Sequence, residues 1–427
     1  MAGDVWESIS AIATDVLEQR FLPTSTLLPE HCKYEDALLF AYMACGTANP
    51  KWEKHCVERL NLAIGQDTRE MSHCALFRGL CGLGWTVEHV SQILGGASES
   101  DEPQLMPQKI PGEDPNEEID TAVTQRLHSG IQAGDFDLIS GLVGYGVYFL
   151  ERWPAGRSIE GLESVIVALE SIAEDVDSGT TWCSPPETLP AWQRIESPAG
   201  YYNLGVAHGV PGVVQFLCQV VKTGIKTPRV SSLLDRAIAW LLAQAGSDRK
   251  RLRFSSWVNS NGESRDAQPV WCYGDLGIAA ILLQVEKGCA NRTIGTLAHD
   301  MLETCLELPV HLYHVQDAGL CHGATGVAHI YNRIYQMEGD PRFRDAALQW
   351  YESALDMFRP GTGVGGYSKC LMPDRQGTVV WEGWPAFLDG SIGIALALLG
   401  AVTHVEPRWD RALLLSSRFS RTGIKAT

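Results

Sequence analysis

A short pattern occurs six times in this chain: Gly, two residues, Gly, and then an apolar stretch of helical length. The first glycines of the six copies are Gly79, Gly141, Gly209, Gly274, Gly323 and Gly390. Successive copies are 62, 68, 65, 49 and 67 residues apart, which leaves room for two helices with generous loops. Chance is the alternative for any one copy, but six at similar spacing, each opening an apolar run, indicate a repeat architecture.

The segments around the copies have two kinds of helical pattern. Segments between copies, such as 232–246 and 342–358, have one apolar stripe, whereas the copies themselves are apolar on nearly all faces. This alternation predicts an outer layer of amphipathic helices around an inner layer of buried ones. We therefore expect an all-α fold, an α/α toroid or double-layered helical barrel. Two glycines at i and i+3 share a helix face, and we expect them to let neighbouring backbones approach closely.

The repeat bears on domain organisation as well. A chain of 427 residues is long enough for two to three average domains, but a ring of repeats shares one core, so we predict a single domain over 1–427. Three stretches interrupt the helical pattern, near 97–119, 178–203 and 253–270. We expect them to be insertions made of loops and short strands, with a hairpin turn at Asn261-Gly262.

The net charge and the length of the apolar runs limit which partners and which cellular location we expect. A net charge of −17 argues against nucleic acid and anionic membranes as partners. No apolar run reaches the roughly 18 residues that a membrane span needs, and the start, MAGDVWES, resembles no secretory leader. We therefore expect a cytoplasmic protein whose twelve cysteines are thiols or metal ligands.

Polar residues stand beside the repeat at a shared register. Immediately before the six first glycines are Arg78, Ser140, His208, Tyr273, His322 and Asp389. One position earlier are Phe77, Ile139, Ala207, Cys272, Cys321 and Leu388. Parallel inner helices would place all twelve residues at the same end of the barrel.

That register predicts a metal site. Two cysteines and a histidine, Cys272, Cys321 and His322, suggest zinc with three protein ligands and one open position, which is typical of catalytic zinc. The alternative for each residue taken alone is a buried thiol or a hydrogen-bonded core histidine. His208 shares the register of the set. Asp137, four residues before Gly141, either moves protons or caps the following helix, and the residues leave this open.

Three motifs, GVAHGVPG (205–212), WCYGDLG (271–277) and LCHGATG (320–326), resemble the lanthipeptide synthetase cyclases, the LanC family, over essentially the whole chain. The resemblance implies a toroid of seven inner and seven outer helices, with 33–46 as our candidate for the inner helix that lacks the glycine pair. It implies that Cys272, Cys321 and His322 hold one Zn²⁺ and that His208 and Asp137 are the acid and base.

Two further residues come from the resemblance alone. Arg265 is the match for a family arginine that precedes WCYG, although Gln268, Pro269 and Val270 stand where we would expect the two to abut. Tyr273 is the tyrosine of the bacterial cyclases, where the eukaryotic LanC-like proteins usually have histidine.

The activity that the resemblance implies is ring formation. A precursor-peptide cysteine adds to dehydroalanine or dehydrobutyrine and forms lanthionine or methyllanthionine. The implied partners are a dehydrated precursor with its leader and core, a separate dehydratase that acts first, and a transporter complex to which the enzyme is peripherally attached.

Three other functions remain as alternatives. One is a LanC-like enzyme that adds a different thiol, such as glutathione, against which the WCYG motif counts. Another is a non-catalytic zinc scaffold for peptide-modifying partners, against which the retention of His208 and Asp137 counts. A glycosidase or terpene cyclase on an α/α barrel would need paired carboxylates or an aspartate-rich motif, and we find neither.

Overall fold

The computed structural model describes residues 2–20, 33–65, 73–95, 114–225, 228–248, 251–289, 291–371 and 379–419. Contacts between residues divide them into two compact units. The first comprises the described residues of 1–70, 86–113 and 314–409, and the second those of 71–85, 114–313 and 410–427. The helix α4 (Leu80–Gly95) and the 3-10 helix η3 (Arg408–Leu413) have residues in both. The single domain over 1–427 stays a prediction.

The first unit is built from helical pairs and one hairpin. Its elements are α1 (Ala2–Glu18), α2 (Lys33–Thr47), α3 (Pro50–Gly65), α13 (Ala324–Glu338), α14 (Pro341–Leu355), β7 (Lys369–Leu371), β8 (Val380–Glu382) and α15 (Ser391–Val402). The helices α2 and α3 pack as one pair and α13 and α14 as another, and α15 contacts α1, α2 and α13. Segment 33–46, our candidate inner helix, is α2, and it is buried throughout residues 34–43.

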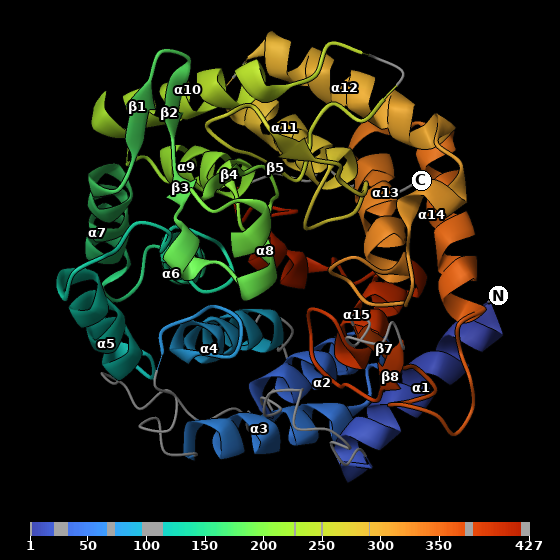
Figure 1. Ribbon diagram of the computed structural model, residues 1–427. Helices are drawn as coiled ribbons and strands as arrows, with labels where there is room; N and C mark the ends of the chain where they lie inside the picture. The colour runs from blue at the N-terminus through green and yellow to red at the C-terminus, as the bar shows by residue number, and fades with distance from the viewer. Residues whose placement is uncertain are drawn as a thin grey trace. The chain divides into compact units, whose positions relative to one another are not determined.

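The second unit repeats the same pairing. Its helices are α5 (Glu117–His128), α6 (Leu142–Arg152), α7 (Ser158–Ser171), α8 (Ala191–Glu196), α9 (Val210–Lys222), α10 (Pro228–Gln244), α11 (Asp275–Cys289) and α12 (Arg292–Glu307), with the 3-10 helices η1 (Pro186–Thr188) and η2 (Val310–Tyr313). Its strands are β1 (Glu174–Val176), β2 (Gly179–Thr181), β3 (Cys183–Ser184), β4 (Tyr201–Asn203), β5 (Trp257–Val258) and β6 (Ser264–Arg265). The helix α9 contacts α6 and α11, while α7, α10 and α12 pair with α6, α9 and α11 respectively (Figure 1).

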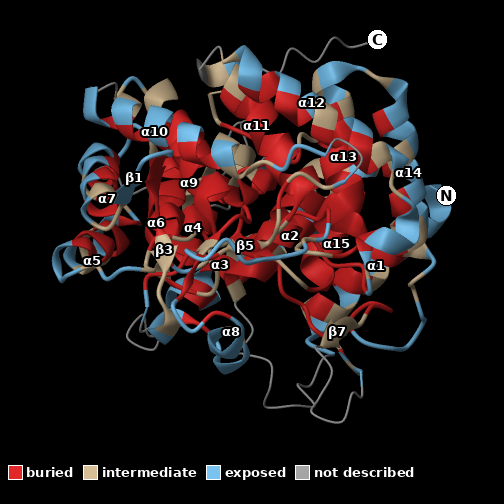
Figure 2. Ribbon diagram, turned by 45° about the horizontal axis from the view of Figure 1, so that its top comes forward, coloured by how far each residue is buried: buried red, intermediate tan, exposed pale blue. Residues whose placement is uncertain are grey.

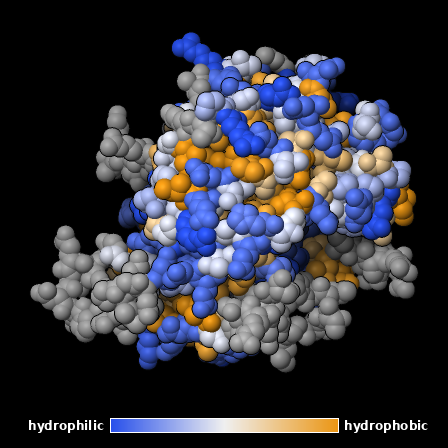
Figure 3. Space-filling view, turned by 90° about the vertical axis from the view of Figure 1, so that its left-hand side faces the viewer, coloured by the Kyte–Doolittle hydropathy of each residue, from blue (hydrophilic) through white to orange (hydrophobic). Residues whose placement is uncertain are grey.

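The helices fall into two classes by burial, as the sequence predicted: some are buried on all sides and others along one stripe. In α9 every residue from 210 to 220 is buried, whereas the amphipathic α10 buries one stripe that includes Leu234, Ile238 and Leu241. The same contrast holds in the first unit between α15 and α14 (Figure 2). On the side of the molecule where α5, α7 and α10 lie, hydrophilic residues are mixed with smaller apolar groups (Figure 3). The helices that follow the glycine pairs are therefore the inner layer.

The inner helices begin without side-chain caps because the preceding loop supplies the acceptors. The N–H groups of residues 142–144 donate to the carbonyls of 135–137, and those of 324–326 donate to 317–319, at 2.7–3.3 Å. Each pair is seven residues apart. The first N–H groups of a helix have no partner inside the helix, so these bonds satisfy them with main-chain atoms alone. Neither α6 nor α13 has a side-chain cap.

This loop corrects our explanation of the glycine pairs. A Cβ on Gly326 would lie 1.9 Å from the carbonyl oxygen of Leu320, and a Cβ on Gly144 would lie 2.5 Å from that of Leu138. In both helices the closest backbone belongs to the helix's own preceding loop, six residues earlier, and not to a neighbouring helix. The pair is thus needed because the loop folds back onto the first helical turn.

Gly326→Ala tests this requirement. The added methyl group cannot coexist with the Leu320 carbonyl, so the loop over 317–322 must move. We expect the free energy of unfolding to fall by about 3 kcal/mol, as for overpacking in a tight site. Urea denaturation measures the change. Gly65→Ala is the control, since a Cβ there meets nothing within 4 Å. Equal unfolding free energies for the two variants would contradict the account.

Two of the predicted insertions combine in one small sheet. Strands β3, β4, β5 and β6 pair in that order and all antiparallel, and they fall within 178–203 and 253–270. The rings of Tyr201 and Trp257 stack at 5.4 Å between centroids, and Gly262 takes the positive φ of 80° that the turn between β5 and β6 requires. The expected short strands and hairpin are confirmed. The 97–119 insertion lies mostly outside the described residues.

Within the described residues, no helix combines the length and the apolar character that crossing a membrane would require.

Candidate active site

The loops before the inner helices are joined by main-chain hydrogen bonds at the predicted register. In the second unit, the N–H of Phe77 donates to the carbonyl of Ile139 at 3.2 Å. The N–H of Leu138 donates to Ala207 at 3.1 Å, and the N–H of Ala207 donates to Cys272 at 3.5 Å. Four successive loops are thus held side by side. His208 and Cys272 become neighbours through this frame although they are 64 residues apart in the sequence.

The first unit holds Cys321 in the same way. The N–H of Cys321 donates to the carbonyl of Leu388 at 2.9 Å, so Asp389 lies beside the Cys321 loop. The Asp389 carboxylate accepts hydrogen bonds from the indole of Trp384, at 3.0 Å, and from the ammonium of Lys369. Asp389, which directly precedes the N-cap residue Gly390 of α15, therefore binds two side chains.

Cys272, Cys321 and His322 come together as potential metal ligands. Their sulfur atoms and a ring nitrogen of the histidine all lie within 4.8 Å of one another. Cys272 is buried, and the other two are half-buried. Cys321 raises the pKa of His322 to about 9, against the opposing effect of burial. Two sulfurs and one imidazole are a donor set that suits zinc. Within the described residues these three form the group that could hold a metal ion.

Gly205 allows the loop that carries Cys272 to pack closely against it. A Cβ on Gly205 would lie 2.3 Å from the Cys272 carbonyl oxygen and 2.7 Å from the Tyr273 ring. The amide of Asn203 bridges the two segments, because Nδ2 donates to the Tyr273 hydroxyl at 3.3 Å and Oδ1 accepts from the N–H of Gly205 at 2.9 Å. Tyr273 is therefore half-buried beside Cys272, with its hydroxyl held by Asn203.

His208 and Asp137 form a close pair. Nδ1 of His208 lies 2.5 Å from Oδ2 of Asp137, while Oδ1 accepts from the N–H groups of Ser140 and Gly141 at 2.8 Å each. Burial alone would raise the pKa of Asp137, but the His208 hydrogen bond and charge and the two N–H groups lower it below its ordinary value. The His208 side chain is 44% exposed. Asp137 thus both caps its loop and orients the imidazole of His208, whose side chain is nearly half exposed.

Arg265 contacts residues of α8. It lies on β6, where its guanidinium pairs with Glu196 at 3.1 Å and sits 5.1 Å above the ring of Trp192. Both partners belong to α8, and both ends of the ion pair are nearly half exposed. Residues 268–270, which separate Arg265 from WCYG, form the loop that folds back on α11, since a Cβ on Gly274 would lie 2.2 Å from the Gln268 carbonyl oxygen.

Sequence reasoning missed Asp275, which anchors the start of α11. Its carboxylate accepts the N–H of Arg253 at 2.7 Å and that of Phe254 at 3.0 Å, and the residue is fully buried. Burial raises its pKa to about 6, although the two N–H groups oppose the shift. An aspartate directly after the first glycine, in the first turn of a helix, was the available signal. Asp275 ties the segment after α10 to the Cys272 loop.

The raised pKa of Asp275 makes a prediction for stability against pH. Its pKa in the unfolded chain is about 3.9, so the folded protein holds this proton more tightly. The stabilisation is therefore complete below pH 4 and is lost as pH rises through about 6. We expect the unfolding free energy of the wild type to fall relative to Asp275→Asn by about 2 kcal/mol from pH 4 to 7. Urea titrations at four pH values measure it, and a constant difference would contradict it.

Comparisons with known proteins agree with this geometry. Residues 37–414 match the model of the family described as "Lanthionine synthetase C-like protein". The chain is 23% identical over 309 residues to "Nisin biosynthesis protein NisC" of Lactococcus lactis subsp. lactis, covering 68% of this chain and 66% of that one. It is 25% identical over 182 residues to "Glutathione S-transferase LANCL1" of Danio rerio, covering 41% of each. Both matches thus span less than two thirds of the relative.

The solved structure of nisin cyclase is similar over nearly the whole chain. The match has a TM-score of 0.72 at 18% identity and covers 95% of this chain and 97% of that one. This likeness confirms the predicted fold class, an all-α toroid with a few small sheets. Because the family model matches most of the sequence, this chain belongs to the lanthionine synthetase C-like proteins.

Proposed function

We propose that this protein is a zinc-dependent lanthipeptide cyclase. It would catalyse the intramolecular addition of precursor-peptide cysteine thiols to dehydroalanine or dehydrobutyrine, forming lanthionine or methyllanthionine. The observation that carries the proposal is the convergence of Cys272, Cys321 and His322 within 4.8 Å, next to loops that hold His208 and Asp137. Membership of the family and the likeness to nisin cyclase support it.

Cys272, Cys321 and His322 would hold one Zn²⁺ per chain. When bound, the ion would lower the pKa of an incoming cysteine thiol, which is near 8.5 in a free peptide. With three protein ligands, the ion would have room for the substrate sulfur as a further ligand. The main-chain bond from Ala207 to Cys272 keeps the His208 loop against this ligand.

His208 and Asp137 would handle the protons. As the new C–S bond forms at Cβ of the dehydroamino acid, the electrons of the C=C bond move onto the carbonyl as an enolate. Nε2–H of His208 then donates its proton to Cα, and the proton released by the thiol balances this donation. Asp137 accepts the hydrogen bond of Nδ1–H, which fixes the ring and directs Nε2 at the acceptor. Tyr273 would orient the substrate beside Cys272, and Arg265 would contact the peptide from β6.

The proposal names partners and a location. The substrate is a dehydrated precursor peptide with leader and core, so a separate dehydratase must act first. We place the reaction in the cytoplasm, peripheral to a membrane-associated complex that includes a transporter.

Ring closure can be measured directly. The zinc-loaded protein is mixed with a dehydrated precursor, and free thiol is followed at unchanged peptide mass. We expect rapid thiol loss, its disappearance after zinc is chelated, and its return when zinc is restored. A rate equal to that of the peptide alone would overturn the proposal.

A second candidate is the addition of glutathione to dehydroamino acids, favoured by the name of the zebrafish relative. The same assay separates the two. Glutathione transfer adds the mass of glutathione to the peptide, whereas cyclisation leaves the mass unchanged. We expect unchanged mass even when glutathione is present in excess.

A further inference from the structure

Segment 410–418 is held by inner helices that lie far earlier in the sequence. Its two arginines both bind Glu151 at the end of α6. Arg411 pairs with the carboxylate at 3.1 Å, and Arg418 donates to the main-chain carbonyl. Glu151 is itself only 2% exposed. Two points of the segment, seven residues apart, are thus fixed to one buried residue.

The turn between the two arginines is strained and is held by glutamine side chains. Leu414 has a φ of 60°, which is unfavourable for a leucine and persists only where the surroundings impose it. Its carbonyl accepts Nε2 of Gln215 in α9 at 3.3 Å and Nε2 of Gln284 in α11 at 3.2 Å. Nε2 of Gln219 donates to the Ser416 carbonyl at 3.4 Å. Three buried glutamines of the inner layer therefore fix the path of this turn.

Leu413 joins this turn to the loop of a candidate metal ligand. The indole Nε1 of Trp271 donates to the Leu413 carbonyl at 3.0 Å, and Trp271 is 1% exposed. A Cβ on Gly277 would lie 2.3 Å from the Trp271 carbonyl oxygen, so the main chain of Trp271 is packed on the first turn of α11. Trp271 is thus held by its side chain and by its main chain, and Cys272 directly follows it.

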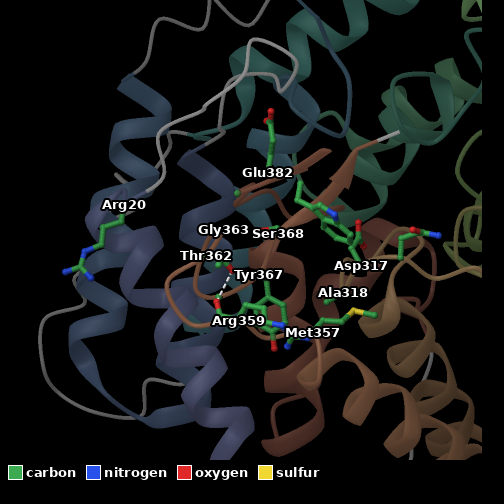
Figure 4. A pocket seen from close by; sticks show the side chains of 14 residues that line it. Arg20, Asp317, Ala318, Met357, Arg359, Thr362, Gly363, Tyr367, Ser368 and Glu382 are labelled. Carbon is green, nitrogen blue, oxygen red and sulfur yellow. Dashed lines mark hydrogen bonds between the residues drawn. The ribbon is translucent and has the colours of Figure 1, made fainter. Parts of the chain in front are cut away.

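The loop that carries Cys321 is supported by other residues. Both oxygens of the Asp317 carboxylate accept main-chain N–H groups, from Gly319 and from Cys370 of β7, at 3.0 Å each. Asp317 also lines a cavity of about 700 Å³ in the first unit (Figure 4). None of these contacts involves segment 410–418, so the two cysteine ligands have separate supports.

We propose that segment 410–418 is a positioning element of the metal site: by holding Trp271 it fixes the loop of Cys272, and with it the place of one sulfur ligand. A metal ion binds more tightly to ligands that are already in place, because ordering them costs no further free energy. Groups that orient metal ligands without touching the metal change its affinity by about 10- to 100-fold. That this ligand set takes zinc rests on the proposed function, whereas the placement of Cys272 does not.

Substitution of two buried tryptophans tests the inference. Trp271→Phe deletes the indole donor to Leu413 and keeps most of the apolar volume. Trp182→Phe is the control, because Trp182 is also fully buried and donates to the main-chain carbonyl of Leu169 at 2.9 Å, outside the ligand loops. Both variants should unfold at similarly lowered urea concentrations. Only Trp271→Phe should weaken zinc binding by the full chain, by about tenfold, in competition with a chromophoric chelator.

A glutamine variant tests whether the segment itself is responsible. Gln284→Met removes one of the two side-chain donors to Leu414 and leaves Trp271 intact. We expect it to weaken zinc binding by about threefold, in the same direction as Trp271→Phe. Gln244→Met is the control on the outer helix α10, where the amide donates to Trp240 of its own helix, and it should bind zinc like the wild type.

Alkylation reads the position of the loop without any metal. The full chain, freed of metal, is treated with iodoacetamide, and mass spectrometry of the digest gives the rate at each cysteine. Cys272 is 7% exposed, so its reaction requires the loop to open. Trp271→Phe should raise the rate at Cys272 by about tenfold and leave that at Cys321 within about twofold.

The outcomes separate this inference from the proposed function. Equal zinc affinities of Trp271→Phe and Trp182→Phe, a Gln284→Met variant that binds zinc like the wild type, or unchanged alkylation of Cys272 would overturn the positioning element. If the wild type closes rings and Trp271→Phe changes nothing, the positioning element alone is refuted. If Trp271 protects Cys272 in a chain that neither binds zinc nor closes rings, the cyclase assignment alone is refuted.

Discussion

Cys321→Ala is expected to reduce the rate of ring closure by about 10³-fold or more and to remove the bound zinc. Two losses combine in this figure. Without the metal only a few per cent of the substrate thiol is ionised at neutral pH, a loss of roughly 30-fold. The sulfur is also no longer held against its acceptor, and that loss of positioning accounts for the rest. Thiol loss at unchanged peptide mass gives the rate, and mass spectrometry of the digested protein gives the zinc content.

A matched control distinguishes a ligand from an ordinary cysteine. Cys183 on β3 is also half-buried, and burial raises its pKa to about 11, so it is a protonated thiol outside the metal group. Cys183→Ala should keep one zinc per chain and the wild-type rate. If Cys321→Ala closes rings as fast as Cys183→Ala, the metal ligands have been assigned wrongly.

His208→Ala is expected to lower the rate by about 10²- to 10⁴-fold, the range of a general acid or base, while zinc stays bound. The imidazole is the group whose Nδ1 contacts Asp137, so its removal deletes the proton donor and leaves the three ligands in place. Added imidazole should restore part of the rate. Asp137→Asn should cost less, about 10- to 100-fold, since Nε2 survives and only its orientation suffers.

The control for this pair is His311→Ala, which removes an exposed histidine from η2 and should change nothing. A His208→Ala variant that has lost its zinc would mean that His208 acts on the metal group and not on protons. Wild-type activity in His208→Ala would exclude the acid role.

The glycine pairs show most clearly how much of the fold could be predicted from the sequence. Each pair marks the start of an inner helix, and the residues two positions before the first glycine, such as Ala207 and Cys272, are those whose main chains bond from loop to loop. A local pattern repeated six times predicts a register because every copy folds alike. The reason offered for the glycines was wrong, since a one-dimensional pattern cannot tell which backbone approaches Gly326.

The features that the sequence did not predict depend on pairings between distant residues. Lys369 forms an ion pair with Asp389, twenty residues away. Arg265 lies on β6, which pairs with β5, and forms an ion pair with Glu196 of α8. No spacing or composition rule connects these positions. The joining of two insertions into one sheet is of the same kind, because β4 meets β5 across a gap that contains α9 and α10.

The main-chain bonds that seat each inner helix also bear on how the protein can change. These bonds give the first N–H groups of each helix main-chain acceptors. The side chain of the residue before the first glycine is therefore not needed to cap the helix. Ser140 and His208 occupy that place in consecutive loops, one with a small hydroxyl and the other with an imidazole. Natural variation or deliberate redesign can therefore replace the side chain at this position in one loop, while the main-chain bonds that seat the helix stay the same.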